Sequence, residues 1–162
     1  WEIALKSYNT PSAIALSRQK VSYINPKNTK ENKCQKGAYV VNITSYESNV
    51  TIVASGTEVE LALKVQDKLK ENNIHSKVVS MPCMELFDKQ TEDFRKDIIE
   101  QNSLVVTLEA GSVMSWQKYV KDKGMNIGID QFGKSAPYKE VYGHFDLSEE
   151  KIVDYIQRKL RE

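Results

Sequence analysis

A short stretch with the spacing of a phosphate-binding loop is the first candidate for chemistry in this sequence of 162 residues. Residues 128–135 read GIDQFGKS and fit the pattern G-x-x-x-x-G-K-[ST]. In that pattern the glycines let backbone N–H groups converge on nucleotide phosphates, the lysine adds positive charge and the hydroxyl meets magnesium. A helix must also begin at the Lys-Ser pair. Because Asp130 would repel phosphate and Pro137 delays the helix, we interpret the stretch as an ordinary loop and keep nucleotide binding as an alternative.

Two further stretches could bind an anion, since each is expected between the carboxyl end of a strand and the start of a helix. They are SGT at residues 55–57 and AGS at residues 110–112. Open α/β sheets bind ligands at such places, and the free N–H groups of a helix start attract negative charge. Glu58 follows the first stretch and Glu109 precedes the second, so each carboxylate can satisfy the helix end itself. We therefore favour helix caps over a regulatory anion site.

The other titratable and nucleophilic residues do not assemble into an active site. His75 and His144 are the two histidines, and neither stands in the sequence context of a general base, so His144 is interpreted as a packed or surface residue. Cys34 and Cys83 are far apart and lack metal-ligand spacing. We predict no catalytic residue, no cofactor-binding residue and no metal ligand in this chain.

Composition and charge narrow the possible partners. The chain has 40% hydrophobic and 28% charged residues, as ordinary globular proteins do. Its 23 basic and 22 acidic residues give a net charge of +1, which offers no excess for nucleic acid or anionic lipid. No apolar run approaches membrane-spanning length. We expect neither nucleic acid nor a membrane as a partner, and two unpaired thiols favour a cytoplasmic location.

The chain begins inside a helical pattern, WEIALKSYN at residues 1–9, without a methionine. On this ground we expect a C-terminal piece of a longer protein. The apolar run at residues 13–16 predicts a buried strand, since a proline precedes it and a polar stretch follows. Residues 22–36 are rich in Asn and Lys and lack an apolar period, so they predict a linker that contains a domain boundary.

From residue 37 onward, strand and helix patterns alternate. Residues 37–46 predict a hairpin or an irregular edge strand. Further strands are expected over residues 50–55, 75–81, 103–110 and 125–129, and helices from Thr57, over 91–100, over 112–120, from Pro137 and from Ser148. Such alternation is typical of right-handed crossovers and a mostly parallel sheet, so we predict an α/β protein with a three-layer α/β/α sandwich.

Local patterns predict how these helices begin and which faces they bury. Thr57 and Glu60 fit a capping box, and Ser148 fits an N-cap. The last helix should bury one side, made of Ile152, Val153, Ile156 and Leu160. Helical spacing also predicts core or interface packing for Met114, Trp116 and Tyr119.

Several longer motifs occur together in one order. They are SRQ (17–19), ASGTEVELALKV (54–65), KVVSMPCMELFDKQ (77–90), LEAGSVMSWQKYV (108–120), GIDQFGKSAP (128–137) and EVYGHFDLSEEKIV (140–153). Over nearly its whole length the chain resembles the C-terminal part of transketolase. In that family the loop usually reads GIDQFGASAP, and Lys134 stands where a small residue is common. The phosphate-loop pattern then looks like one substitution in an unrelated loop.

The resemblance implies a fold and an activity. Transketolases are homodimeric, thiamine-diphosphate enzymes of the pentose phosphate pathway that move a two-carbon ketol unit between sugar phosphates. They bind a divalent metal, Mg or Ca, in the first of three α/β domains. By this resemblance residues 1–21 are the last helix and strand of the pyrimidine-binding domain, 22–36 a linker, and 37–162 the C-terminal domain. That domain is expected to have a five-stranded mixed sheet with one antiparallel strand, and to serve domain packing and dimer support.

The resemblance also assigns one substrate-binding residue, Arg18. In the family, the arginine of the SRQ motif reaches the phosphate of the sugar substrate, and a guanidinium suits this because it offers paired donors and stays charged. The family usually continues Asn-Leu-Pro where this chain has Lys20, Val21 and Ser22. Since the catalytic histidines, metal ligands and cofactor glutamate of the family lie upstream, this chain alone should neither bind thiamine diphosphate nor catalyse transfer.

Three alternatives stay open from the sequence. One is a related thiamine-diphosphate enzyme with the same last domain, such as deoxyxylulose-phosphate synthase or the β subunit of a keto-acid dehydrogenase. Another is a stand-alone dimerisation module. The third is a nucleotide-binding module that uses residues 128–135.

Overall fold

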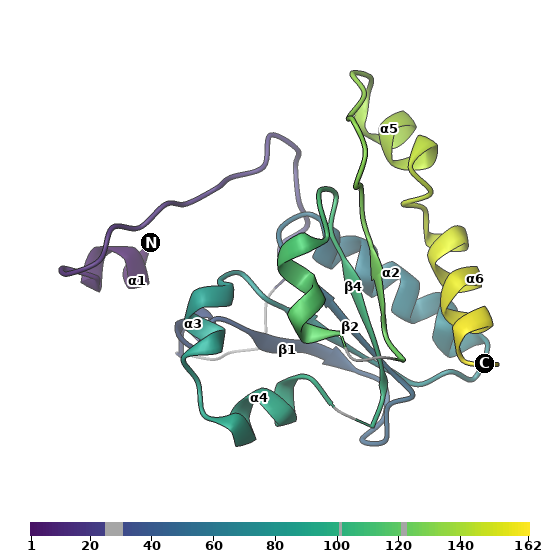
Figure 1. The fold of residues 1–162 in the computed structure, drawn as a ribbon, viewed down its shortest axis with the longest axis horizontal. Coiled ribbons are helices and arrows are strands. Elements are labelled where there is room, and N and C mark those ends of the chain that lie inside the picture. Colours follow the sequence, from purple (N-terminus) through teal and green to yellow (C-terminus); the bar gives the residue numbers. More distant parts are fainter. Residues whose placement is uncertain (25–30, 101, 121–122) are drawn as a thin grey trace.

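The computed structural model describes residues 1–24, 31–100, 102–120 and 123–162, and these residues form one five-stranded sheet with helices on both faces (Figure 1). The strand order is β1-β3-β2-β4-β5. The strands are β1 (Tyr39–Ile43), β2 (Val50–Ala54), β3 (Ser76–Ser80), β4 (Leu104–Leu108) and β5 (Met125–Ile127). β1 pairs antiparallel with β3, and the other neighbours are parallel. The predicted mixed, mostly parallel sheet is confirmed.

Helices cover the two faces of this sheet in separate groups (Figure 1). The helical segments are α1 (Glu2–Lys6), η1 (Lys33–Lys36), α2 (Glu58–Glu71), α3 (Met84–Asp88), α4 (Glu92–Ile98), η2 (Met114–Tyr119), α5 (Tyr138–His144) and α6 (Glu149–Lys159), of which η1 and η2 are 3₁₀ helices. α2 and α6 pack on one face, and α3, α4 and η2 pack on the other. The three-layer α/β/α architecture is therefore confirmed.

Side chains point alternately to the two faces of the sheet along each strand, so each face has its own hydrophobic core. In β2, Ile52 faces α2 and α6, while Val53 faces α3, α4 and η2. β2, β3 and β4 are buried along their whole length, as expected for parallel strands with helices on both sides. β1 is the predicted irregular edge strand, because its pairing with β3 shifts register between Val40 and Asn42.

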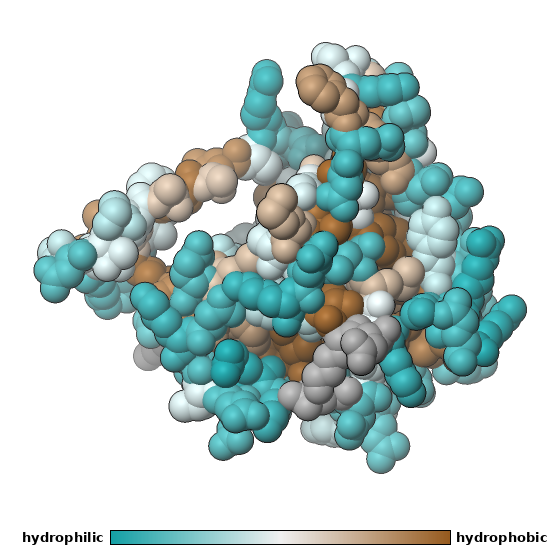
Figure 2. Space-filling view, in the orientation of Figure 1, coloured by the Kyte–Doolittle hydropathy of each residue, from teal (hydrophilic) through white to brown (hydrophobic). Residues whose placement is uncertain are grey.

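The first 24 residues form an N-terminal arm that leaves the sheet domain (Figure 1). α1 is present as predicted but buries none of its residues. The strand prediction for residues 13–16 is wrong, because this segment has no strand pairing and its side chains are exposed. A strand needs a neighbour to take its backbone hydrogen bonds, and no described strand runs beside it. Figure 2 shows hydrophobic residues exposed along this arm.

Two predicted helix caps have different outcomes. Ser148 caps α6 as predicted, since its Oγ accepts the N–H of Lys151 at 3.4 Å. The capping box at α2 is wrong, because Thr57 already has helical backbone angles and its side chain makes no cap hydrogen bond. The Thr57 hydroxyl donates instead to the carboxylate of Glu58 at 2.6 Å. Glu60 accepts a hydrogen bond from the arm, which is described below.

Three smaller predictions shift at helix ends. Pro137 is the N-cap of α5 rather than its first helical residue. Leu160 ends α6 and is 39% exposed, so the prediction that it lines the buried side is wrong, whereas the other three predicted residues of that side are buried. Over residues 112–120 the chain forms the 3₁₀ helix η2, where Trp116 is buried but Met114 is 77% exposed. Residues 25–30 of the predicted linker lie outside the described residues.

Candidate functional site

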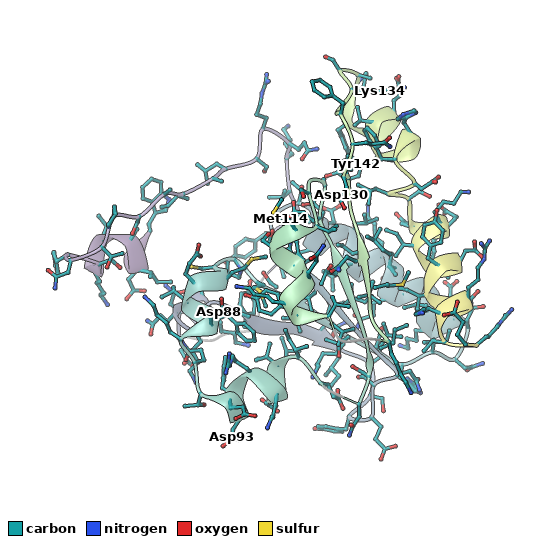
Figure 3. All side chains as sticks on the ribbon, in the orientation of Figure 1. Asp88, Asp93, Met114, Asp130, Lys134 and Tyr142 are labelled. Atoms are coloured by element: carbon teal, nitrogen blue, oxygen red, sulfur yellow. The ribbon has the colours of Figure 1, made fainter. Side chains whose placement is uncertain are left out.

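The loop with the phosphate-binding pattern has another structural purpose. A Cβ atom on Gly128 would lie 2.4 Å from Val113 Cγ1 and 2.7 Å from the carbonyl oxygen of Gly111. Ile129, the next residue, donates its N–H to the same Gly111 oxygen at 2.8 Å. Gly128 therefore lets the loop after β5 press against the loop after β4. α5 begins only at Tyr138, so no helix start meets Lys134, which is exposed at the tip of the loop (Figure 3).

Asp130 of this loop fills the anion position at residues 110–112. Its Oδ1 accepts the hydroxyl of Ser112 at 2.9 Å and the N–H of Val113 at 3.1 Å. The protein thus supplies its own carboxylate to these donors. The prediction that Glu109 satisfies this helix end is wrong, because Asp130, which lies beside η2 (Figure 3), accepts these two hydrogen bonds instead.

At residues 55–57, the predicted helix cap by Glu58 is wrong, because its carboxylate accepts from two side-chain hydroxyls and from no backbone N–H of α2. Glu58 is 5% exposed and accepts hydrogen bonds from the hydroxyls of Thr57 and Tyr142. Burial, together with the bond to Glu58, raises the pKa of Tyr142 to about 12, so its hydroxyl remains a donor at ordinary pH. This arrangement ties α5 to the carboxyl end of β2.

Glu109, at the carboxyl end of β4, points toward the layer that contains α3, α4 and η2. Its Oε2 accepts the indole N–H of Trp116 at 3.0 Å, which fixes η2 on the sheet. Burial raises the pKa of Glu109, and the negative charge of Glu58 acts in the same direction. The connections after β2 and β4 run to opposite faces of the sheet. Open α/β proteins bind ligands between two such strands, at their carboxyl ends. Here both carboxylates are used in internal hydrogen bonds.

The predicted substrate-binding residue, Arg18, lies in the arm and is exposed. Within residues 8–24, only Gln19 and Ile24 are partly buried, so the arm touches the sheet domain just after Arg18. Ser22 donates its N–H to Glu60 Oε2 at 3.1 Å. Gln19 and Tyr142 line the same cavity.

A cavity of about 370 Å³ lies between this part of the arm and the starts of α2, α5 and α6. Its wall includes Gln19 and Val21 from the arm, and Glu60, Tyr142 and Leu147 from the domain. Sequence patterns did not indicate these contacts. Glu60 was interpreted as part of a cap, and Tyr142 carried no functional prediction, because contacts across 38 and 84 positions leave no local pattern.

The remaining candidate residues are dispersed over the structure. His144 is exposed and packs its ring edge-on against Phe145 at 4.8 Å, in agreement with a surface histidine, and His75 is exposed as well. Cys34 and Cys83 are free and partly buried. Among the described residues, no three His, Cys, Asp or Glu side chains gather where they could hold a metal ion. In the same residues, no helix combines the length and apolar character needed to cross a membrane.

Comparisons with known proteins agree with the fold. Residues 37–148 match the family model of the transketolase-like C-terminal domain. The chain is 37% identical over 161 residues to a transketolase of Aquifex aeolicus, covering 98% of this chain and 23% of that protein. It is 36% identical to a chloroplastic transketolase of Solanum tuberosum, covering 94% of this chain and 21% of that protein. The chain thus spans under a quarter of the length of these relatives.

Solved transketolases have the same architecture. The structure superposes on transketolase from Campylobacter jejuni with a TM-score of 0.77 and 32% identity, over 87% of this chain and 21% of that one. It superposes on a Pichia stipitis transketolase complex with sedoheptulose 7-phosphate with a TM-score of 0.73 and 27% identity, over 80% of this chain and 18% of that one. The chain belongs to the transketolase family, and its sheet domain is the family's C-terminal domain.

Proposed function

We propose that this chain works as the C-terminal part of a transketolase that transfers a two-carbon ketol unit between sugar phosphates. The observation that carries the proposal is that 98% and 94% of this chain align with only 23% and 21% of two transketolases. Family neighbours bound to xylulose 5-phosphate and sedoheptulose 7-phosphate support sugar phosphates as the substrate class. Family membership also supports a homodimer, and the two free thiols favour a reducing compartment such as the cytoplasm.

The proposal divides the chain at its arm. Residues 1–21 would be the end of the pyrimidine-binding domain, 22–36 a linker and 37–162 the C-terminal domain. The arm supports this division, because Trp1, Tyr8 and Leu16 are 79%, 90% and 75% exposed. Large apolar side chains in such a row are typical of a surface that another part of the protein covers.

Thiamine diphosphate and its divalent metal would be held by parts of the enzyme other than this chain. The described residues bring together no group of carboxylates, histidines or cysteines that fits a metal ion. At the starts of α2 and η2, the N–H groups of Glu58 and Val113 already donate to protein acceptors, the Ser55 carbonyl and the Asp130 carboxylate, and so are not open to a diphosphate. We therefore assign no step of the transfer to this chain, and its contribution is to domain packing and to substrate phosphate binding.

Arg18 is the residue that we propose for the substrate phosphate. It is exposed, carries a permanent charge, and lies beside the points where the arm is fixed to the domain. A charge-assisted bond of this kind is worth about 1.5–3 kcal/mol, which corresponds to a roughly 10- to 100-fold change in binding. Its phosphate partner would come from the sugar, since the arm leaves the guanidinium open.

The test is Arg18→Leu in the complete transketolase. We expect KM for phosphorylated sugars to rise about 10- to 100-fold, with little change for unphosphorylated ones. Arg161→Leu, the same change at an exposed position near the end of the chain, is the control and should leave both values unaltered. An equal effect of Arg18→Leu on both substrate classes would refute the assignment of Arg18 to phosphate binding.

A further inference from the structure

Between residues 19 and 24, directly after Arg18, the arm lies against the sheet domain, and near its start Asn32 Nδ2 donates to Glu2 Oε2 at 3.0 Å. Gln19 lines the same cavity as Tyr142, the N–H of Ser22 donates to Glu60, and Ile24 packs against the apolar core under α2 and α6. From residue 8 to residue 18 every side chain is exposed. The path of the chain beside Arg18 is therefore set by these contacts.

The contact at Glu60 uses the two carboxylate oxygens separately. Oε2 accepts the N–H of Ser22 at 3.1 Å, and Oε1 lies 3.3 Å from Nζ of Lys64, one turn further along α2. The lysine holds the carboxylate on the side of α2 that faces the arm. The N–H of Ser22 is the main reason that the pKa of Glu60 lies below its usual value, so Glu60 accepts as an anion.

The contact at Tyr142 continues into the core of the domain. Its hydroxyl donates to Glu58, which is 5% exposed and also accepts from Thr57 at 2.6 Å. Gln19 and Tyr142 line the same cavity. The residue next to Arg18 thus lies beside a ring that is hydrogen-bonded to the first residue of α2. The cavity of about 370 Å³ lies beside both Glu60 and Tyr142, on the side that faces the arm.

We propose that Glu60 and Tyr142 are positioning residues, through which the C-terminal domain sets the place of Arg18 for the phosphate of the substrate. The inference rests on the proposed function of Arg18. It gives the last domain a direct effect on substrate recognition although neither residue touches the sugar. The domain then affects KM for phosphorylated sugars and does not affect the chemical step, which kcat measures.

The test compares variants of the complete enzyme with phosphorylated and unphosphorylated acceptor sugars. Glu60→Met removes the acceptor for Ser22 and keeps a helix-forming side chain, Glu60→Gln keeps one acceptor oxygen, and Tyr142→Phe removes only the hydroxyl. Glu71→Met, an exposed position on the same helix, is the matched control. Misplacement of a binding group by a fraction of an ångström is felt strongly, so we expect Glu60→Met and Tyr142→Phe each to raise KM for the phosphorylated acceptor about 3- to 10-fold.

The other readouts separate positioning from a merely structural role. kcat and KM for the unphosphorylated acceptor should stay unchanged, Glu60→Gln should recover most of the loss, and Glu60→Met should have no further effect on KM in an Arg18→Leu background. If Arg18→Leu is selective while Glu60→Met and Tyr142→Phe behave like Glu71→Met, the inference is wrong and the proposed function stands. If Arg18→Leu itself is not selective, both are refuted. An equal loss with both acceptors would also overturn the inference.

Discussion

Replacing Gly128 by alanine tests the close contact between the loops after β4 and β5. The new Cβ would lie 2.4 Å from Val113 Cγ1, 2.7 Å from the Gly111 oxygen and 3.0 Å from the Glu109 oxygen. Carbon atoms normally approach to about 3.5–4.0 Å, so the two loops must separate. That movement would break the hydrogen bond from Ile129 to Gly111, which is 2.8 Å long.

The magnitude follows from these two effects. Overpacking of a dense site costs about 1–3 kcal/mol, and the broken backbone bond adds about 1 kcal/mol. We therefore expect Gly128→Ala to lower the free energy of unfolding by about 2–4 kcal/mol. With a urea dependence of about 2 kcal/mol per molar, the midpoint of unfolding should fall by about 1–2 M.

The assay is urea unfolding of the 162-residue chain followed by circular dichroism, with Gly133→Ala as the control. Gly133 belongs to the same loop, but a Cβ there would meet no atom within 4 Å. We expect this control to change stability by no more than about 0.5 kcal/mol. Equal midpoints for the two variants would refute the reasoning, because they would show that Gly128 is not needed for loop contact.

Three further predictions concern single side chains. Because the pKa of Glu109 is raised, the folded state holds the proton of its carboxyl group more tightly than the unfolded chain does. Protonated Glu109 therefore adds to stability below pH 4.5, and this contribution is lost as the pH rises through the pKa of the folded state. Glu109→Gln keeps an acceptor for Trp116, and pH-dependent thermal unfolding should show a smaller loss of stability from pH 4.5 upward than in the unaltered chain. Lys134→Ala should leave ATP binding undetectable by calorimetry, as in the unaltered chain; binding that only the unaltered chain shows would contradict this. Lys77, whose side chain is 6% exposed, donates to the Asp97 carbonyl at 2.9 Å and lies 3.3 Å from a carboxylate oxygen of Glu100. Lys77→Ala should therefore lower the free energy of chemical unfolding by about 2–4 kcal/mol, and a loss below about 0.5 kcal/mol would refute that role.

Local patterns in the sequence predicted the sheet domain well, because its central strands are apolar runs bounded by turn residues. Residues 50–55 contain β2, and residues 75–81 contain β3. The same pattern failed at residues 13–16, since an apolar run becomes a strand only where a neighbour completes its hydrogen bonds. Whether such a neighbour is present depends on the folded protein as a whole, and a short run of apolar residues does not indicate it.

The candidate site was less predictable for a related reason. Arg18 was indicated only through the resemblance to a family, since an exposed arginine has no distinctive spacing. In the sequence, Asp130 was notable only as a negative charge that would repel phosphate. In the structure its carboxylate accepts hydrogen bonds from Ser112 and Val113, because the loop after β5 folds back on the loop after β4. Glu60 fits a capping box just as well as a contact to the arm, and only the backbone angles of Thr57 separate the two.

The strand order β1-β3-β2-β4-β5 has a consequence for how the domain forms during synthesis. β1 leaves the ribosome first, but its neighbour β3 follows only after β2 and the whole of α2. β2, at the centre, gains its second neighbour when β4 emerges, and α6, which closes one layer of the core, comes last. Contacts between distant segments form slowly and leave apolar strands uncovered meanwhile. Until α6 is made, the apolar side chains of the sheet that pack against it stay exposed to water.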